Sequence, residues 1–362
     1  MTARTRIVIG ILTVIIGIAL ATQAYAGEGW EIEIHGGALI SSNPTAGSTA
    51  LPPPNPPVPF IPPSSAFILE PVPSWFFGDG TTILNGAVPA RLGAAIVPLD
   101  AMLKSRFVER GSGGSIGLRI DRPLSTRLTA EASIDWANGQ LGLLARSNEA
   151  VQTSETSFLT TWNALLGIVP GVDKAVSSDA NVKGGSGSQV VTTGTLLINI
   201  EPRHNFTPYV ALGAGYIASS AGPSLTLTGN YRFAFGDPAV ALLRIDQTDT
   251  VTVQSTARNT VTWVVGGGLK YAVSNRWGVR VDVRDHINRD VIQTTVSAVP
   301  TSAPTPDSFA LTLGFASGET LVFSANPNFR STLSSTVNDF RTFKGSGIVN
   351  QVNASAGIFW RF

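Results

Sequence analysis

Strict alternation of apolar and polar residues recurs along this chain from Trp30 onward. In the first such stretch, residues 30–35, tryptophan and isoleucine alternate with glutamate and histidine. Successive side chains of a β-strand point to opposite faces of the sheet. The stretch therefore predicts a strand with one apolar and one polar face.

Seven later segments predict further strands of about ten residues. The eight predicted strands cover residues 30–40, 112–121, 127–136, 189–200, 207–217, 259–272, 277–286 and 347–362. The segment 207–217 is small and apolar on both faces, so its pattern leaves its orientation open.

Short and long connections between these strands alternate without exception. The short ones are Asp121–Thr126, Glu201–Thr207 and Ala272–Arg276, and the long ones are 41–111, 137–188, 218–258 and 287–346. Outer-membrane barrels have short periplasmic turns and longer extracellular loops. A soluble β-sandwich, which we consider as an alternative, has no reason for this asymmetry. We therefore expect an all-β, antiparallel, up-and-down transmembrane barrel of eight strands with its apolar face outward.

Aromatic residues gather at the strand ends, on the apolar faces. Those expected at the periplasmic end are Trp30, Tyr271, Trp277, Trp360 and Phe362, and Trp136 lies at the opposite end of its strand. Amphipathic rings concentrate at membrane interfaces, so these residues predict two girdles.

Charged residues of both signs occupy the polar faces in equal number. They are Glu31, Glu33, Arg119, Asp121, Arg127, Glu131, Asp135, Lys270, Arg280, Asp282, Arg284 and Arg361. An arginine facing lipid at the bilayer midplane costs about 2–4 kcal/mol, so we expect this face to line the lumen. An eight-stranded interior is just wide enough for side chains to fill it. The balance of charge predicts a network of ion pairs that plugs the barrel.

The long connections contain patterns of their own. Pro52–Pro63 favours polyproline II, and Thr81–Met102 favours a helix broken near Pro89 and Pro98. Residues 154–169 predict an amphipathic helix. Its apolar face packs on the first long loop in one interpretation, and forms a lid or a lipid contact in another.

Two hairpins are also expected within these connections. Residues 225–235 and 243–254 predict either a continuation of the fifth and sixth strands above the membrane or two more spanning strands. Phe309–Phe315 with Thr320–Ser324 is a similar candidate. The strand number could therefore rise to ten or twelve. Trp75-Phe76-Phe77 either packs over the barrel mouth or forms a surface for an apolar ligand.

Composition narrows the class of protein. Hydrophobic residues make up 43% of the chain and charged residues only 14%. After residue 26 no apolar run approaches the roughly 20 residues of a membrane helix, which excludes a helical bundle. The lack of cysteine excludes disulfides and thiolate metal sites. A formal net charge of +1 gives no basic excess for nucleic acid.

The first 26 residues have the three parts of a secretory signal. Arg4 and Arg6 precede the apolar segment Ile7–Thr22, and Ala24-Tyr25-Ala26 is a small-residue cleavage site. We expect residues 1–26 to be removed and residues 27–362 to form a barrel domain in the outer membrane.

The segments TPYVALGAGY and GGGLKYAVSNRWGVRVDVRDH, with the terminal NASAGIFWRF, resemble the small outer-membrane β-barrels of the outer-membrane protein A and W type. The resemblance covers the strands and not the loops. It implies that the last strand, which ends at Phe362, is recognised by the barrel-assembly machinery. It implies little about activity, because one barrel architecture hosts many functions.

No pattern favours catalysis. The chain has 3 histidines: His35 is on the predicted lumen face, His204 is in a short turn, and neither Asp282 nor Asp285 is placed to form an acid–base dyad with His286. We expect no enzyme activity, no metal and no cofactor. The favoured function is a structural or surface-interaction role in the outer membrane, with lipid around the barrel and a surface partner or an apolar small molecule at the loops. A narrow channel for small or apolar solutes is the alternative.

Overall fold

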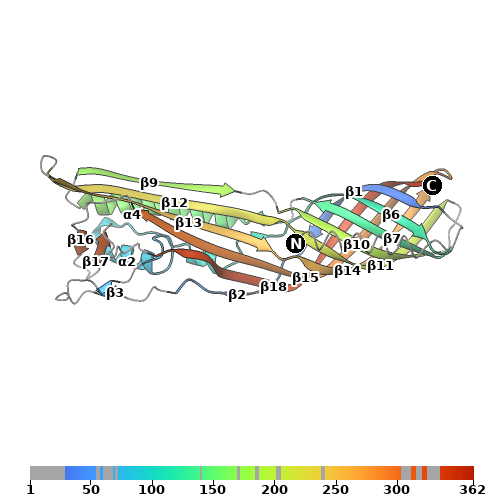
Figure 1. Ribbon diagram of the computed structural model, residues 1–362, viewed down its shortest axis with the longest axis horizontal. Coiled ribbons are helices and arrows are strands. Elements are labelled where there is room, and N and C mark those ends of the chain that lie inside the picture. The colour runs from blue at the N-terminus through green and yellow to red at the C-terminus, as the bar shows by residue number, and fades with distance from the viewer. Residues whose placement is uncertain are drawn as a thin grey trace, which may run out of the picture.

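The computed structural model describes residues 29–53, 58–59, 68–69, 72–138, 141–168, 172–183, 187–200, 205–237, 241–302, 311–314, 320–323 and 335–362. The molecule is elongated, with a ring of strands at one end and strands with helices at the other (Figure 1). We call these two regions the barrel and the extension. Residues 1–26, with the predicted signal peptide, lie outside the described residues.

Eight strands form the barrel, and each of the eight predicted segments overlaps one of them. They are β1 (Glu31–Ser41), β6 (Gly113–Pro123), β7 (Leu128–Ala137), β10 (Gln189–Asn199), β11 (Phe206–Ser219), β14 (Thr260–Ala272), β15 (Trp277–Ser302) and β18 (Val337–Arg361). Each pairs antiparallel with the next. Strand β18 also pairs with β1, opposite Glu31 at Arg361. The pairing order is therefore cyclic.

The number of strands is larger than the eight predicted, because the main sheet has 12. The additional ones are β2 (Ala46–Thr49), β9 (Val172–Lys183), β12 (Ala221–Asp237) and β13 (Ala241–Ala257). Strand β12 begins two residues after β11 ends, and β13 ends three residues before β14 begins. The β12–β13 hairpin thus continues β11 and β14 beyond the barrel, as one of the two interpretations of the sequence had it.

Strands also continue through much of what the sequence predicts as long loops. Strand β15 runs on to Ser302, and its residues 292–302 pair with β13 in the extension. Strand β18 begins at Val337, ten residues before the predicted strand. The hydrogen-bonded ladder persists here because its inward side chains find an apolar core to cover.

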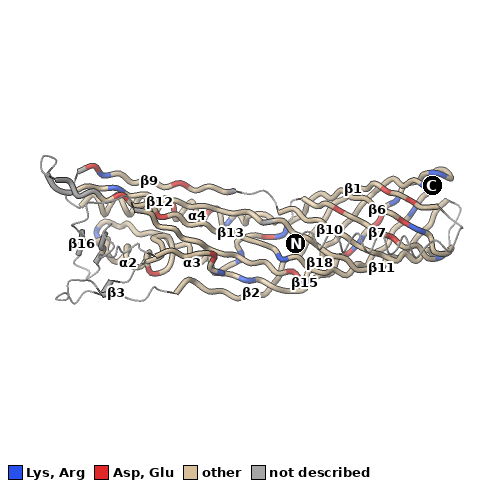
Figure 2. Tube along the Cα trace, viewed as in Figure 1, with Lys and Arg blue, Asp and Glu red and all other residues tan. Residues whose placement is uncertain are grey.

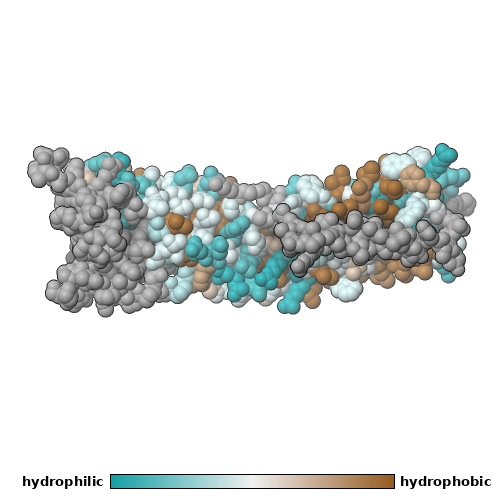
Figure 3. Space-filling view, in the orientation of Figure 1, coloured by the Kyte–Doolittle hydropathy of each residue, from teal (hydrophilic) through white to brown (hydrophobic). Residues whose placement is uncertain are grey.

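Short turns lie at the other end of the barrel. In one of them the Val273 amide donates to the Trp277 carbonyl, and in another the Leu124 amide donates to the Leu128 carbonyl. Apolar side chains of the barrel strands point outward and are exposed, as the brown wall in Figure 3 shows. Polar side chains of the same strands are buried inside. This inverts the arrangement of a water-soluble barrel.

The extension has an apolar core between its sheet and its helices. The helices are α2 (Asp79–Ala87), η1 (Ala90–Leu92), α3 (Asp100–Leu103) and α4 (Ala145–Ile168). Three short pairs accompany them: β3 (Val58–Pro59) with β4 (Ile68–Leu69), β5 (Val108–Glu109) with β8 (Gly142–Leu143), and β16 (Leu311–Gly314) with β17 (Thr320–Phe323). Among the described residues, no helix is long and apolar enough to cross a membrane.

Helix α4 presents its apolar face to this core. It begins nine residues before the predicted start, and Phe158, Trp162 and Leu165 on it are fully buried. The Trp162 ring stacks on Tyr231 of β12 at 3.7 Å between centroids. Packing onto the protein, rather than a lid or a lipid contact, is therefore the arrangement of this helix.

Trp75, Phe76 and Phe77 belong to the same core and are at most 1% exposed. The Phe76 ring stacks on Phe158 at 4.9 Å, and the Trp75 indole N–H donates to the Tyr231 hydroxyl at 3.3 Å. The alternative of an exposed aromatic binding surface is wrong, because these rings have no face left for a ligand.

Candidate functional site: the charged interior of the barrel

The structure places all but two of the predicted lumen residues inside the barrel, where each is at most 6% exposed. They are Glu31, Glu33, Arg119, Asp121, Glu131, Asp135, Lys270, Arg280, Asp282 and Arg284. Figure 2 shows both signs of charge along the barrel strands. Alternation brings them inward, because each occupies the polar position of its strand.

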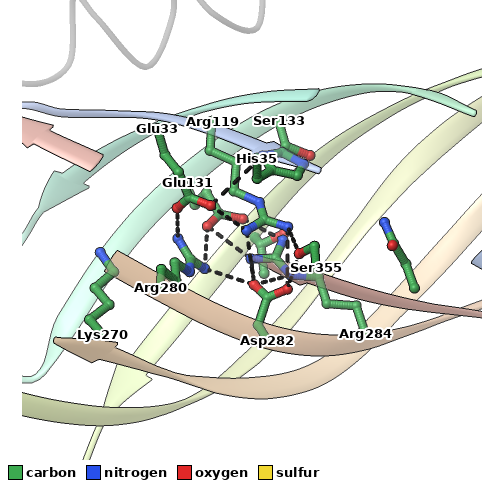
Figure 4. Close-up of polar contacts among 12 residues, drawn as sticks. Glu33, His35, Arg119, Glu131, Ser133, Lys270, Arg280, Asp282, Arg284 and Ser355 are labelled. Carbon is green, nitrogen blue, oxygen red and sulfur yellow. Dashed lines mark hydrogen bonds and ion pairs between the residues drawn. The ribbon is translucent and has the colours of Figure 1, made fainter. Parts of the chain in front are cut away.

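Arg280 of β15 is the centre of the network. Its guanidinium contacts Glu33 and Asp121 at 3.1 Å, Glu131 at 2.7 Å and Asp282 at 3.3 Å. These carboxylates come from four strands, so one side chain links the ring across its diameter. Figure 4 shows the guanidinium groups converging on the carboxylates from different sides.

Arg119 and Arg284 flank this centre. Arg119 contacts Glu33 at 2.8 Å and Asp282 at 3.0 Å. Arg284 forms a bidentate pair with Glu131 and contacts Asp282 at 3.1 Å. Guanidinium groups suit this geometry because their planar donors match carboxylate oxygens two at a time. Asp282 therefore forms ion pairs with the guanidinium groups of Arg119, Arg280 and Arg284.

A second layer lies nearer the short turns. Lys270 contacts both Glu31 and Asp121 at 2.6 Å. Arg361 donates to Glu31 at 2.6 Å from the rim, where its side chain is 38% exposed. The predicted lumen position of Arg361 is thus at the edge of the interior.

A third layer lies toward the extension. His35 Nε2 is 2.5 Å from Asp135 Oδ1, and the Ser133 hydroxyl donates to Asp135 Oδ2 at 3.2 Å. The hydroxyls of Ser133 and Thr193 are 2.7 Å apart. Alternation had placed His35 on the polar face of its strand.

Arg127 is a correction, because the structure places it outside the lumen. It is exposed in the turn before β7, which begins at Leu128. Alternation assigned Arg127 to the polar face, but a residue beyond the last ladder position of a strand no longer follows the pleat.

Tyr209 of β11 is a lumen residue that the sequence pattern did not identify. Its hydroxyl accepts from Arg280 Nε at 2.6 Å and donates to Asp282 at 2.9 Å. A signal for it exists in the glycines of β14, since a Cβ on Gly268 would lie 2.4 Å from that hydroxyl. Gly266 and Gly268 of β14 thus leave room for bulky side chains in the lumen.

The predicted girdle residues lie at the ends of the barrel strands. Trp277 is paired with Trp360, and both are 40% exposed beside the short turns, as is Phe362 at 77%. Trp30 and Tyr271 lie at the same end and are half-buried, Trp30 beneath the Arg122 guanidinium at 4.9 Å. Trp136 is at the opposite end of β7 and is 47% exposed.

A buried ion pair closes the boundary between the barrel and the extension. Arg110 donates to both oxygens of Asp290, at 2.5 and 2.8 Å, and Asp290 is fully buried. The Asn43 side chain donates a hydrogen bond to the Arg110 carbonyl and accepts one from the Arg110 amide. Arg110 thereby ties the first long connection to the sheet directly above the lumen.

The ten buried charges are six carboxylates and four cations, and ion pairs link them across the barrel. Arg280 at the centre is 1% exposed, so its side chain is almost completely shielded from water. In the described part of the chain, no group of three or more His, Asp or Glu residues could hold a metal ion.

No protein-family model matches the chain, and no curated protein matches it. Solved structures do. The outer membrane protein OprG from Pseudomonas aeruginosa is 11% identical with a TM-score of 0.37, covering 93% of this chain and 98% of its own. The outer membrane protease OmpT from Escherichia coli is 8% identical with a TM-score of 0.24, and the match covers 94% of this chain and 99% of OmpT. A mutant of the monoaromatic hydrocarbon channel TodX is 11% identical with a TM-score of 0.23, and the match covers 94% of this chain and 92% of TodX.

Proposed function

We propose that the chain is an integral outer-membrane β-barrel protein with a sealed lumen and a structural or surface-interaction role. The apolar wall spans the bilayer, and the barrel anchors the extension outside the membrane. The short turns face the periplasm, because the long connections that build the extension are of the extracellular kind.

The ion-pair network supports this function above any other feature. A conducting lumen keeps its charged side chains hydrated, whereas the central charges here are buried and paired across the ring. Opening a path would separate Arg280 from four carboxylates in a medium of low dielectric constant, where an unpaired charge costs several kcal/mol.

The apolar wall supports the membrane placement. On β7 it runs from Leu128 to Trp136, and on β10 from Val190 to Ile198. These nine-residue runs match the roughly 9–11 residues of a tilted membrane strand. Exposing such a wall to water would leave an apolar surface far larger than soluble proteins tolerate.

The remaining roles follow from this placement. Residues 1–26 direct export and are then cleaved, and the last strand, ending at Phe362, is recognised by the barrel-assembly machinery. Lipid surrounds the barrel, and partners meet the extension. We assign no catalytic step, since His35 and His286 are both buried among the lumen side chains.

Single-channel conductance of the refolded protein in a planar bilayer tests this function. Heat-dependent gel mobility first establishes that the barrel has folded. We expect no openings at moderate voltage. Discrete openings would replace the sealed barrel by the alternative, a narrow channel for small or apolar solutes. A soluble monomer that never inserts would overturn the membrane placement itself.

A further inference from the structure

Three cations lie together on the outside of the molecule, at the upper end of the apolar wall. Arg258 is in the connection from β13 to β14, Arg289 is on β15, and Lys344 is on β18. We call them the basic patch. Figure 3 shows hydrophilic side chains gathered where the brown wall ends.

Strand register places the three on neighbouring strands at adjoining levels. The Arg258 amide donates to the carbonyl of Val291, two residues above Arg289. Lys344 is paired with Gln293, four residues above Arg289. Neighbouring strands are about 4.8 Å apart and residues two apart on one face about 7 Å, so Arg258 lies between the levels of Arg289 and Lys344, which are about 13 Å apart along the strands.

Two strongly exposed apolar residues lie beside and just below Arg289. Ile348 is paired with Arg289 and is 78% exposed. Trp263 is paired with Ile287, one step below Arg289 on the same face of β15, and is 66% exposed. This arrangement is complementary to an anionic lipid, because the cations would face its headgroup and the exposed apolar side chains would face its acyl chains.

Within the described residues, no ion pair is recorded for Arg258, Arg289 or Lys344. The nearest carboxylates on this face are committed elsewhere: Asp285 accepts from the Asn350 amide, and Asp339 accepts from the Ser297 hydroxyl. Three like charges without a counterion repel one another, so an external anion would stabilise them.

Among the residues that the structure describes, the opposite side of the barrel has no such cluster at the corresponding level. The residues that follow the wall there are Asn138 after β7, Ser188 before β10 and Ser220 after β11. The basic patch is therefore local to the β14–β15–β18 side, unlike a uniform belt of cations around the barrel.

We propose that the basic patch binds the phosphate of an anionic membrane lipid whose acyl chains lie on the wall below it. This inference rests on the membrane placement proposed above. Each Lys or Arg near a membrane surface strengthens binding of anionic lipid by about 1 kcal/mol, or about fivefold. Recognition requires both the charge of the headgroup and the apolar wall, so the occupant is a lipid and not a free anion.

Quenching of Trp263 by brominated lipids tests the proposal. The full chain is reconstituted in phosphatidylcholine vesicles that contain a fixed fraction of brominated phosphatidic acid or, separately, of brominated phosphatidylcholine. A matched series carrying Trp263→Phe isolates the signal of Trp263 from that of the other tryptophans. We expect phosphatidic acid to be preferred beside Trp263 at least about fivefold.

The triple variant Arg258→Ala, Arg289→Ala, Lys344→Ala should reduce this preference to near one. Arg91→Ala, Lys104→Ala, Arg146→Ala is the matched control, because it removes the same charge from exposed positions of the extension. It should keep the preference. Equal quenching by the two lipids in the unmodified protein, or an unchanged preference in the first variant, would overturn the lipid site while leaving the membrane placement intact. Quenching by neither lipid would remove the membrane placement and the lipid site together.

Discussion

Strand β15 passes through two regions that bury opposite kinds of side chain. Between residues 280 and 290 its even-numbered residues point inward and are Arg, Asp, Arg, His, Asn and Asp. Above residue 291 the even-numbered residues still point inward, but they are Ile292, Thr294, Val296 and Ala298. The alternation of inward and outward side chains does not change, but the inward side chains change from mostly charged to mostly apolar between Asp290 and Ile292.

The outward face of the strand reverses at the same level. Val279, Val281 and Val283 are exposed beside the barrel, whereas Gln293, Thr295 and Ser297 face outward in the extension. A side chain is buried according to what surrounds the protein at that height. Arg110 and Asp290 form a buried ion pair at the level where the apolar core begins.

The two interiors are also held by different forces. The extension is stabilised by apolar area removed from water, with rings such as Trp162 on Tyr231 in close contact. The barrel interior gains little from that effect, because its charged groups must recover through pairing what they lose in hydration. Removing one partner should therefore be costly inside the barrel.

The largest effect is expected from the double substitution Arg280→Met, Arg284→Met. It leaves Glu131 and Asp282 without their main cations, and breaking even one buried pair costs about 3–5 kcal/mol. Urea-dependent loss of the heat-resistant gel band in vesicles measures the change. Arg127→Met, Arg276→Met removes the same charges from exposed turns and should unfold like the unmodified protein. Equal stability of the two doubles would contradict a barrel held by its ion pairs.

A smaller effect should separate the two regions on one face of β15. Val281→Arg places a charge at mid-height on the exposed wall and should destabilise the inserted barrel by about 2–4 kcal/mol. Gln293→Arg adds the same charge 12 residues higher, on the outward face of the extension, and should be nearly neutral. Comparable losses in the same unfolding assay would mean that both heights meet the same medium.

The smallest effect concerns a buried carboxylate of the extension. Asp249 accepts from the Ser74 hydroxyl at 2.7 Å and the Trp75 amide at 2.6 Å, and its burial raises its pKa to about 7. The neutral form is favoured in the folded state, so stability present below the unfolded pKa of about 4 is lost as the pH rises through 7.

The extension should therefore lose about 3 kcal/mol between about pH 5 and pH 8. Limited proteolysis of the extension across this range measures the loss. Asp249→Asn keeps the shape and removes the titration, so its digestion rate should vary much less with pH. A variant that retains the full pH dependence would assign the effect to another group.

Much of the barrel follows from alternation alone. The inward positions of Glu33, Arg119 and Asp282 are recoverable because a strand encodes its two faces along a short stretch of chain. The same rule erred at Arg127, where the strand had not yet begun, and gave no answer for Tyr209, whose strand is apolar on both faces. The glycine opposite Tyr209 is a signal that needs the strand pairing before it can be interpreted.

The sequence by itself determined where the barrel strands run, which face of most of them is polar, and at which end the short turns lie. Each of these depends on residues close together in the chain. Only the tertiary structure decided that Arg284 would meet Glu131, 153 residues away, and that Arg361 would meet Glu31, 330 residues away. It also decided that β15 and β18 extend beyond the barrel, because a hydrogen-bonded ladder continues only where there are neighbouring strands to pair with and a core to pack against. Register around the ring is a property of all eight strands together, and no single segment contains it.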